Sequence, residues 1–295
     1  MCAVHEFGGD WTTEKLDRVR KYLLAYTIIF DRNPRARKLH TIYVDAFAGT
    51  GYRTSHPTLP DILALTELSE ADNQAFLKGS ARIALEVSPA FKEYIFIEQD
   101  PSHVQELKHL RTEFSNRANK IHIVTQDANT YLQDWCRDTD WRMTRAVVFL
   151  DPYGMQVEWP VIEALAKTKA VDLWILFPLG VAVNRLLTKS APPPEKWARA
   201  LTRIFGTEDW KKVFYPHKKV LTLFGEEDVQ TKEADFAKIS DFFVERLKNV
   251  FTAVAPNPLP LMNSKNNPLY LLCFASGNPT GSSTAVKIAQ HILRR

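Results

Sequence analysis

The sequence predicts an α/β fold in which a doubly wound, mostly parallel sheet carries helices on both faces. Five short, almost continuously apolar segments occur between residues 41 and 177, as expected for strands that are buried on both faces. Helical patterns alternate with these segments, which is typical of parallel sheets. Four of the five segments are followed within three residues by an acidic residue, so polar groups gather where the strands end.

The elements are expected in a regular order. A first helix is expected over 12–30, where apolar side chains recur at helical spacing behind a threonine that can cap the helix. The expected strands are 41–44, 94–97, 121–124, 146–150 and 171–177, and the helices between them are 80–87, 103–114, 131–136 and 159–167. Near the C-terminus, 250–256 and 267–276 suit an antiparallel hairpin at the sheet edge, and a helix is expected over 284–293.

We expect one domain over residues 1–295, with three departures from the alternating pattern. Residues 1–40 hold the N-terminal helix and a basic loop. Residues 52–80 are expected to form an insertion after the first strand, with a short helix over 62–68. Residues 184–249 combine a proline cluster with basic helical patterns, which predicts a mostly helical insertion.

The composition is that of an ordinary globular protein. The chain has 295 residues, of which 45% are hydrophobic and 24% are charged, and its net charge of +4 permits a nucleic-acid partner without requiring one. No apolar run approaches the ~20 residues that a membrane span needs, and no secretory signal is evident. The three cysteines lie far apart and form no CxxC pair, so a reduced, cytoplasmic setting is expected.

The first strand leads into an acid and two glycines, in the pattern Asp45-x-Phe47-x-Gly49-x-Gly51. Glycines let a ligand approach the backbone closely. Neither GxGxxG nor GxxxxGK[ST] is present, and an acid ahead of the glycines disfavours a pyrophosphate. The pattern therefore favours a cationic ligand such as S-adenosylmethionine, although a turn that needs glycines for its shape alone is the structural alternative.

The next two strand ends also carry acids. Ligands of open α/β sheets bind beyond the carboxyl ends of the strands. Glu98 can accept both hydroxyls of an adenosine ribose, Asp127 can accept the adenine amine, and Ala128 can present a backbone N–H. Each acid alone is equally explained by a helix N-terminus, where acids are favoured. The set, with one acid after each of three successive strands, is what favours cofactor binding.

The fourth strand ends in Asp151-Pro152-Tyr153-Gly154. A carboxylate and a proline-fixed carbonyl can accept N–H bonds from an amino group and direct its lone pair at an electrophilic methyl. Tyr153 offers a face on which a planar base could stack. Asp151, Pro152 and Tyr153 are therefore the candidate catalytic residues, and a turn punctuated by Pro and Gly is the alternative.

These motifs resemble those of class I S-adenosylmethionine-dependent methyltransferases, and Asp151-Pro152-Tyr153 resembles the DPPY motif of amino-methyltransferases with one proline missing. The resemblance implies a Rossmann-like methyltransferase fold with an antiparallel C-terminal hairpin strand and helical insertions. The missing proline places the aromatic residue one position early, which bears on the identity of the target amine.

The chain resembles the bacterial three-Cys-motif partner protein family more closely. The shared marks are T-x-x-K-L-x-x-V-x-K-Y-L from Thr12, YVDAFAGTG, GSARIALE, FIEQD, FLDPYG and YLLCFAS. In that family the three cysteines belong to a partner encoded nearby, so the cysteines of this chain are not the motif. The resemblance implies a cysteine-rich partner, with an iron–sulfur protein among the candidates, and leaves the substrate open.

A basic stretch lies in the second insertion. Lys211, Lys212, Lys218 and Lys219 flank Phe214 and Tyr215. Cations interleaved with aromatic side chains can hold phosphates and stack on bases, so these lysines are the candidate nucleic-acid residues, and a solvated face is the alternative. The histidines show no HxxxH or HExxH spacing, so no metal site is predicted.

Three functions fit these patterns. The first is a methyltransferase that acts on an amine in RNA or DNA with the three-Cys-motif protein. The second is a non-catalytic, cofactor-binding subunit of the complex with that partner. The third is a nuclease-like enzyme that uses Asp45, Glu98 and Asp151 as metal ligands.

Overall fold

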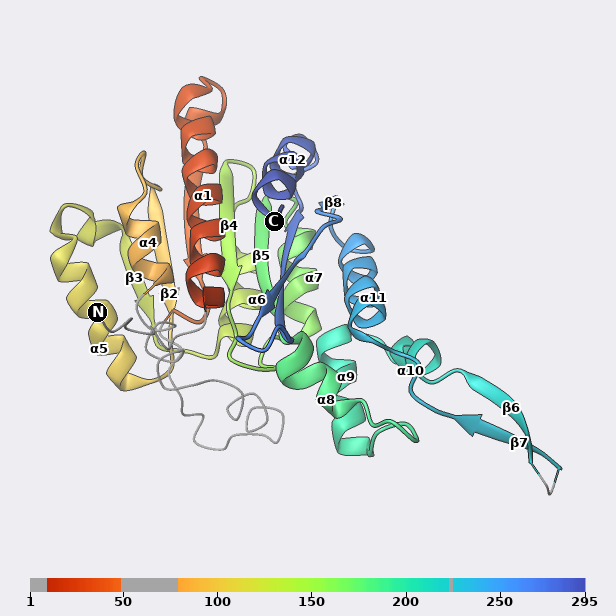
Figure 1. Ribbon diagram of the computed structural model, residues 1–295. Helices are drawn as coiled ribbons and strands as arrows, with labels where there is room; N and C mark the ends of the chain where they lie inside the picture. Colours follow the sequence, from red (N-terminus) through yellow and green to blue (C-terminus); the bar gives the residue numbers. More distant parts are fainter. Residues whose placement is uncertain (1–9, 49–78, 223–224, 295) are drawn as a thin grey trace, which may run out of the picture.

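The computed structural model of the protein describes residues 10–48, 79–222 and 225–294. Its centre is a sheet with the strand order β3-β2-β1-β4-β5-β10-β8, in which β9 also pairs with β10 (Figure 1). The strands are β1 (His40–Asp45), β2 (Glu93–Ile97), β3 (Ile121–Val124), β4 (Thr144–Leu150), β5 (Val171–Phe177), β8 (Ala253–Val254), β9 (Leu259–Met262) and β10 (Pro268–Ser276).

The first five strands are parallel, and β10 runs antiparallel to β5 and β8. Every residue of β5 is buried, as are the last five residues of β4, so the apolar runs of the sequence lie under helices on both faces. The predicted fold class, a mostly parallel sheet with an antiparallel C-terminal strand, is confirmed. The expected antiparallel pair at the sheet edge is also confirmed, because β8 pairs with β10 and the two strands end the sheet beyond β5.

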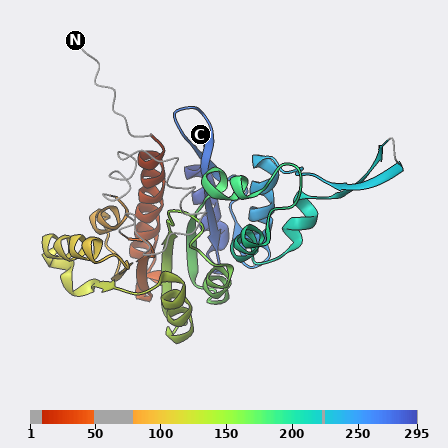
Figure 2. The same cartoon turned by 90° about the horizontal axis from the view of Figure 1, so that it is seen from below.

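Helices cover both faces of the sheet. On one face α1 contacts α4 and α12, and on the other α6 packs against α7 (Figures 1 and 2). The longer helices of the sheet region are α1 (Asp10–Arg32), α4 (Ser80–Glu86), α5 (Pro101–Glu113), α6 (Ala128–Asp138), α7 (Trp159–Lys167), α11 (Phe236–Lys248) and α12 (Ser282–Ile292). Three short helical turns are η1 (Ala36–Lys38), η2 (Ser115–Lys120) and η3 (Leu179–Val183).

The long helix α1 is fixed to the sheet by a polar and aromatic contact. Tyr22 packs against Phe274 at 4.8 Å between ring centroids and donates a 2.7 Å hydrogen bond to Asp172. Ser276 donates to the other oxygen of Asp172 at 2.5 Å. A carboxylate buried among apolar residues is tolerated when both oxygens are hydrogen-bonded, so α1, β5 and β10 are joined at this point.

The two insertions have different outcomes. Residues 49–78, and with them most of 52–80 and the short helix expected over 62–68, lie outside the described residues. Within 184–249 lie α8 (Asn184–Leu186), α9 (Glu195–Phe205), α10 (Asp209–Phe214) and all of α11, but also the antiparallel hairpin of β6 (His217–Thr222) and β7 (Gly225–Gln230). The hairpin extends away from the sheet (Figures 1 and 2).

Candidate functional site

The carboxyl ends of β1 and β4 meet at the middle of the sheet. The register places Asp45 opposite Phe149, and the Ala46 N–H donates to the Phe149 carbonyl at 3.1 Å. Asp151 follows β4 by one residue. The first and the fourth acid of the sequence motifs are therefore neighbours, and the charge of Asp151 lowers the tendency of Asp45 to ionise.

Asp151 is held by a lysine that the sequence motifs did not single out. The Lys15 ammonium, on α1, lies 2.6 Å from Asp151 Oδ2, and its side chain is fully buried. The rings of Trp11 and Phe149 lie within 5.5 and 6.0 Å of Lys15 Nζ. The lysine is thus enclosed by a carboxylate and two aromatic faces, which are favourable surroundings for a buried cation.

The sequence did carry a signal for Lys15. Trp11, Lys15, Val19, Tyr22 and Tyr26 follow at helical spacing, and all five are buried in α1. A lysine in the middle of such a stripe must be paired within the core, since isolated buried charges are costly. The family marks quoted above also include this lysine, in T-x-x-K-L, but only as a mark.

Burial controls the charges of this group. The pKa of Asp45 is raised to about 7, chiefly by desolvation and also by the nearby Asp151 carboxylate, against opposing hydrogen bonds from Ser80 and the Phe47 backbone and the charge of Lys15. Burial also raises the pKa of Asp151, which Lys15 partly offsets. The pKa of Lys15 is lowered by burial and raised by Asp151. Two buried oxygens, Asp45 Oδ1 and Asp151 Oδ1, have no hydrogen-bond partner among the residues that the structure describes.

The turn after β4 is fixed by contacts from two other elements. Tyr270 of β10 donates from its hydroxyl to the Tyr153 carbonyl at 2.9 Å. Asn129 of α6 donates to the Gln156 carbonyl at 2.9 Å and accepts from the Glu158 N–H at 2.9 Å. The Tyr153 side chain is only 6% exposed, so its ring does not present an open face in this structure.

The acids after β2 and β3 are both engaged by backbone N–H groups. Glu98 Oε1 accepts from the Asp100 N–H at 2.7 Å, and burial raises the pKa of Glu98 against that bond and the nearby His103 charge. Asp127 Oδ1 accepts from the Thr130 N–H at 2.9 Å and thereby caps α6, which the sequence analysis named as its structural alternative. Ala128 is buried at the first turn of that helix.

The structure bears only in part on the glycine motif after β1. The Phe47 backbone hydrogen-bonds to Asp45, and the Ala48 N–H donates to the Ile97 carbonyl at 3.0 Å, so the turn is tied to β2. Gly49 and Gly51 lie outside the described residues. Their predicted role in cofactor binding stays a prediction.

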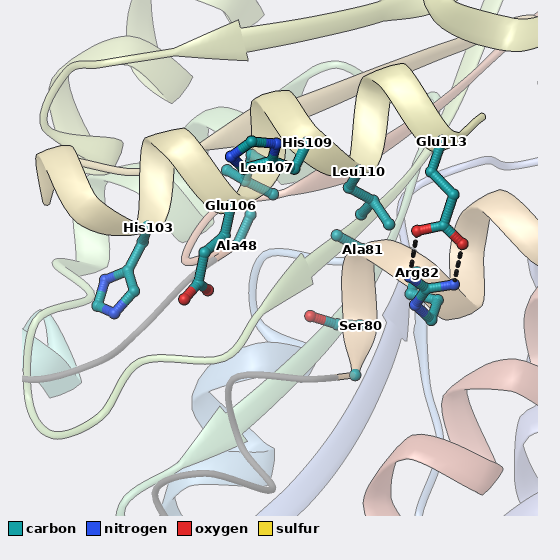
Figure 3. A pocket seen from close by; sticks show the side chains of 11 residues that line it. Ala48, Ser80, Ala81, Arg82, His103, Glu106, Leu107, His109, Leu110 and Glu113 are labelled. Atoms are coloured by element: carbon teal, nitrogen blue, oxygen red, sulfur yellow. Dashed lines mark hydrogen bonds and ion pairs between the residues drawn. The ribbon is translucent and has the colours of Figure 1, made fainter. Parts of the chain in front are cut away.

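A cavity of about 260 Å³ lies between α4 and α5, beside this turn (Figure 3). Ala48 and Leu107 lie on its apolar side, and Ser80, His103 and Glu106 add polar groups. His103 is 8% exposed, and its Nδ1 lies 3.8 Å from Asp100 Oδ1 without a hydrogen-bond partner within the described ranges. Because Ser80 also interacts with Asp45, the cavity adjoins the carboxyl ends of the strands.

The candidate nucleic-acid lysines are separate from this group and mostly paired with acids. Lys211 lies 2.7 Å from Glu208, Lys218 2.5 Å from Glu233 and Lys219 3.3 Å from Glu226. Lys218 and Lys219 lie on β6, and the two aromatic residues between the lysine pairs, Phe214 and Tyr215, are buried. These aromatic rings pack inside the insertion, so they are not available to stack on bases in this structure.

Two features that would bear on function are absent from the described residues. In the ranges 10–48, 79–222 and 225–294, no three histidine, cysteine, aspartate or glutamate side chains are grouped as a metal site requires. Over the same ranges, no helix has the length and apolar character that crossing a bilayer demands.

Comparison with known proteins gives structural similarities only. No protein-family model and no curated protein matches the chain. The crystal structure of LPL1258 from Legionella pneumophila, of family model DUF519, aligns with a TM-score of 0.48 and 13% identity over 98% of this chain and 92% of that one. Spermidine synthase from Thermotoga maritima aligns with a TM-score of 0.32 and 10% identity over 92% and 60%.

A spermidine synthase in complex with the transition state analogue AdoDATO aligns with a TM-score of 0.35 and 9% identity, over 92% of this chain and 62% of that one. At these identities and TM-scores, the similarities have no bearing on what this chain binds. The resemblance to the three-Cys-motif partner family therefore rests on the sequence marks alone.

Proposed function

We propose that the chain is an S-adenosylmethionine-dependent methyltransferase that acts on an amino group in nucleic acid together with a three-Cys-motif protein. One observation carries the proposal: a buried cluster of Asp45, Lys15 and Asp151 at the carboxyl ends of β1 and β4, with two carboxylate oxygens that lack partners in the described part of the chain. Clusters of buried, mutually perturbed titratable groups are typical of functional sites.

The residues present fit the cofactor. An oxygen of a buried carboxylate without a partner is costly, and a cationic ligand with N–H donors would satisfy Asp45 Oδ1. Glu98 has a second carboxylate oxygen for ribose hydroxyls, and Asp127 Oδ2 and the Ala128 N–H are open to an adenine edge, since the first N–H groups of a helix have no intrahelical partner. When bound, the cofactor supplies an electrophilic methyl group.

Asp151 would act on the target amine through its second oxygen. Lys15 holds Oδ2 and keeps the carboxylate ionised, which leaves Oδ1 to accept an N–H of the amine. Positive charge develops on a nitrogen as it is alkylated, and a fixed carboxylate stabilises it. Because burial raises the pKa of Asp151, Oδ1 is a stronger proton acceptor than an exposed aspartate and can take the proton that the nitrogen releases.

A specific observation favours the second candidate, a non-catalytic subunit that keeps the cofactor pocket. Asp151 already has a cation at 2.6 Å, and the Tyr153 ring is buried. In that case the pair stabilises the fold and no amine enters. The nuclease alternative has no supporting cluster among the described residues.

Transfer of a labelled methyl group to RNA and to DNA, measured with and without the three-Cys-motif protein, tests the proposal. Asp151→Asn keeps the shape of the side chain and should lower transfer about a hundredfold or more, the effect of losing one electrostatic contact to the transition state. Cofactor affinity, measured by calorimetry, should change little. Absence of transfer under all conditions, with normal cofactor binding, would favour the non-catalytic subunit.

A further inference from the structure

The amino ends of the strands carry a group of cations that the proposed function does not use. Basic residues lie in the turn between α1 and β1 and directly before β2, which is the neighbour of β1 in the sheet. All are exposed. We call this group the amino-edge cluster, and its members are Arg32, Arg35, Arg37, Lys38 and Lys92.

The amino-edge cluster is not neutralised by acids. Among the described residues, none of its members forms an ion pair with a carboxylate. The nearest acids in the sequence are Asp31, at the end of α1, and Glu93, which lies 2.7 Å from His40 and 3.5 Å from His122. The lysines of the insertion differ in this respect, because three of the four have a glutamate partner.

The loop that carries the cluster is held in one conformation. Asn33 Oδ1 accepts from the Arg35 N–H at 3.0 Å and the Ala36 N–H at 3.3 Å. Lys92 Nζ donates to the Arg37 and Leu39 carbonyls at 3.0 and 2.6 Å, so the cation before β2 is fixed onto the loop. A charged surface that is already ordered loses less conformational entropy when it binds a ligand.

We propose that the amino-edge cluster is a docking surface for the phosphate backbone of nucleic acid. Three of its five cations are arginines, whose planar fork of donors matches phosphate oxygens better than a lysine does. At the opposite end of the sheet Asp127 is exposed and Glu98 is partly exposed, and these carboxylates disfavour a polyanion there. A nucleic acid held at the amino edge has an anchor away from those acids.

The spacing between the two ends suits a nucleic-acid segment. From His40 to Asp45, β1 rises about 17 Å at 3.3–3.4 Å per residue, which is the axial rise of about five base pairs at 3.4 Å each. A helical segment or a strand of that length can therefore contact the amino edge and reach the carboxyl ends. The inference extends the proposed function by assigning a surface to the polymer, but binding requires neither cofactor nor turnover.

The test measures, by fluorescence anisotropy, how a labelled RNA hairpin and a labelled DNA duplex bind to the full chain without cofactor. The titration is repeated over a range of salt concentrations. Each phosphate contact contributes a log–log slope of about −0.7 to −0.9. The variant with Arg35→Glu, Arg37→Glu and Lys38→Glu should flatten the slope by about 2–3 and weaken binding at least about tenfold at low salt. Thermal unfolding should be unchanged, since all three side chains are exposed.

A matched control separates the surface from the net charge. Lys196→Glu, Lys265→Glu and Lys287→Glu also change exposed lysines, and either set of three reversals takes the net charge from +4 to −2. We expect this control to change the slope by less than about one. Equal losses in the two variants, or a wild-type chain that binds neither nucleic acid, would overturn the proposal.

Vesicles that contain phosphatidylserine complete the design. If the Arg35, Arg37 and Lys38 reversals abolish binding to these vesicles and leave RNA and DNA binding intact, the surface is a membrane contact and the proposal is wrong. Loss of nucleic-acid binding together with normal methyl transfer to a free nucleoside would support the docking surface. Normal docking without any transfer would contradict only the proposed function.

Discussion

The two ends of the same parallel sheet place charge in opposite ways. At the carboxyl ends, Asp45, Lys15 and Asp151 are buried and lie within one another's fields. At the amino ends, Arg35, Arg37 and their neighbours are exposed and have no acidic partner among the described residues. Burial shifts the pKa of a side chain, so a buried group can exchange protons near neutral pH. An exposed cation keeps its ordinary charge and can bind a polyanion through contacts that salt screens.

The largest effect is expected at the buried pair. Lys15→Met leaves Asp151 buried without its cation, and breaking a buried pair typically costs about 3–5 kcal/mol. Urea denaturation should show this loss of unfolding free energy. Lys21→Met is the matched control on the same helix, because Lys21 and Asp17 are largely exposed and such pairs contribute about 0–1 kcal/mol.

A double variant sharpens this result. Lys15→Met combined with Asp151→Asn removes both charges, so it should be more stable than Lys15→Met alone. Equal stability of the single and double variants would show that the two side chains are not coupled.

The acid after β2 gives the next largest effect. Glu98→Ala should remove hydrogen bonds to the cofactor, at about 1.5–3 kcal/mol for each charge-assisted bond, which is at least tenfold in affinity. Titration calorimetry with S-adenosylmethionine measures it. Asp100→Ala is the control: Asp100 caps α5, so its loss should lower stability and leave affinity unchanged. If the affinity of Glu98→Ala for the cofactor is unaltered, Glu98 is not a cofactor-binding residue.

Cofactor affinity should depend on pH through Asp45. Burial raises the pKa of Asp45 to about 7, so the carboxyl is increasingly protonated below that value. A cationic ligand favours the ionised form, so binding should release a proton and weaken by up to about tenfold for each unit below pH 7. Asp45→Asn should bind weakly with a flat pH profile. A wild-type profile equally flat between pH 5 and 8 would contradict this role.

The Asp45 carboxyl affects the folding stability of the cofactor-free protein with the opposite pH dependence. An unfolded aspartate ionises near its ordinary pKa, so the unfolded state loses its proton first. The contribution of Asp45 to stability is therefore present at low pH and falls as the pH rises toward about 7. Asp172 behaves alike, since burial raises its pKa to about 6. Neither group stabilises the fold by being ionised.

The smallest effect is expected in the insertion. Lys218→Glu with Lys219→Glu should flatten the salt dependence of nucleic-acid binding by less than about one, because both lysines already face glutamates. The same anisotropy titration measures this variant. A change of two or more in the salt slope would show that the insertion binds nucleic acid, as the sequence alone predicts. The contrast between the two ends of the sheet would then not explain where nucleic acid binds.

The order of the strands and the positions of their acids could be predicted from the sequence, because parallel strands are continuous apolar runs that end in polar turns. The segment 217–230 was expected within a mostly helical insertion but forms a hairpin. The sequence did not indicate this hairpin, because its short, charged strands lack the apolar alternation that is typical of strands. The sequence also indicated the edge pair of β8 and β10, but the pairing of β10 with β5 joins segments that are far apart in the chain, which local patterns do not encode.

The candidate site was predictable in its acids but not in its pairing. The motifs gave Asp45, Glu98 and Asp151 as separate strand ends. They could not show that a lysine 136 positions earlier in the chain would reach Asp151, because that contact depends on how α1 crosses the sheet. The burial of Tyr153 could not be predicted either, because the hydroxyl group that fixes its backbone belongs to Tyr270 of β10.

The buried Lys15–Asp151 pair also constrains how this chain can change over generations. A substitution at either position leaves the other charge stranded in the core, so single substitutions there are removed through lost stability whether or not a methyl group is ever transferred. Only a simultaneous replacement of both residues avoids this loss of stability. We therefore expect a lineage that abandons the chemistry to keep both residues, because the stability of the fold depends on the pair.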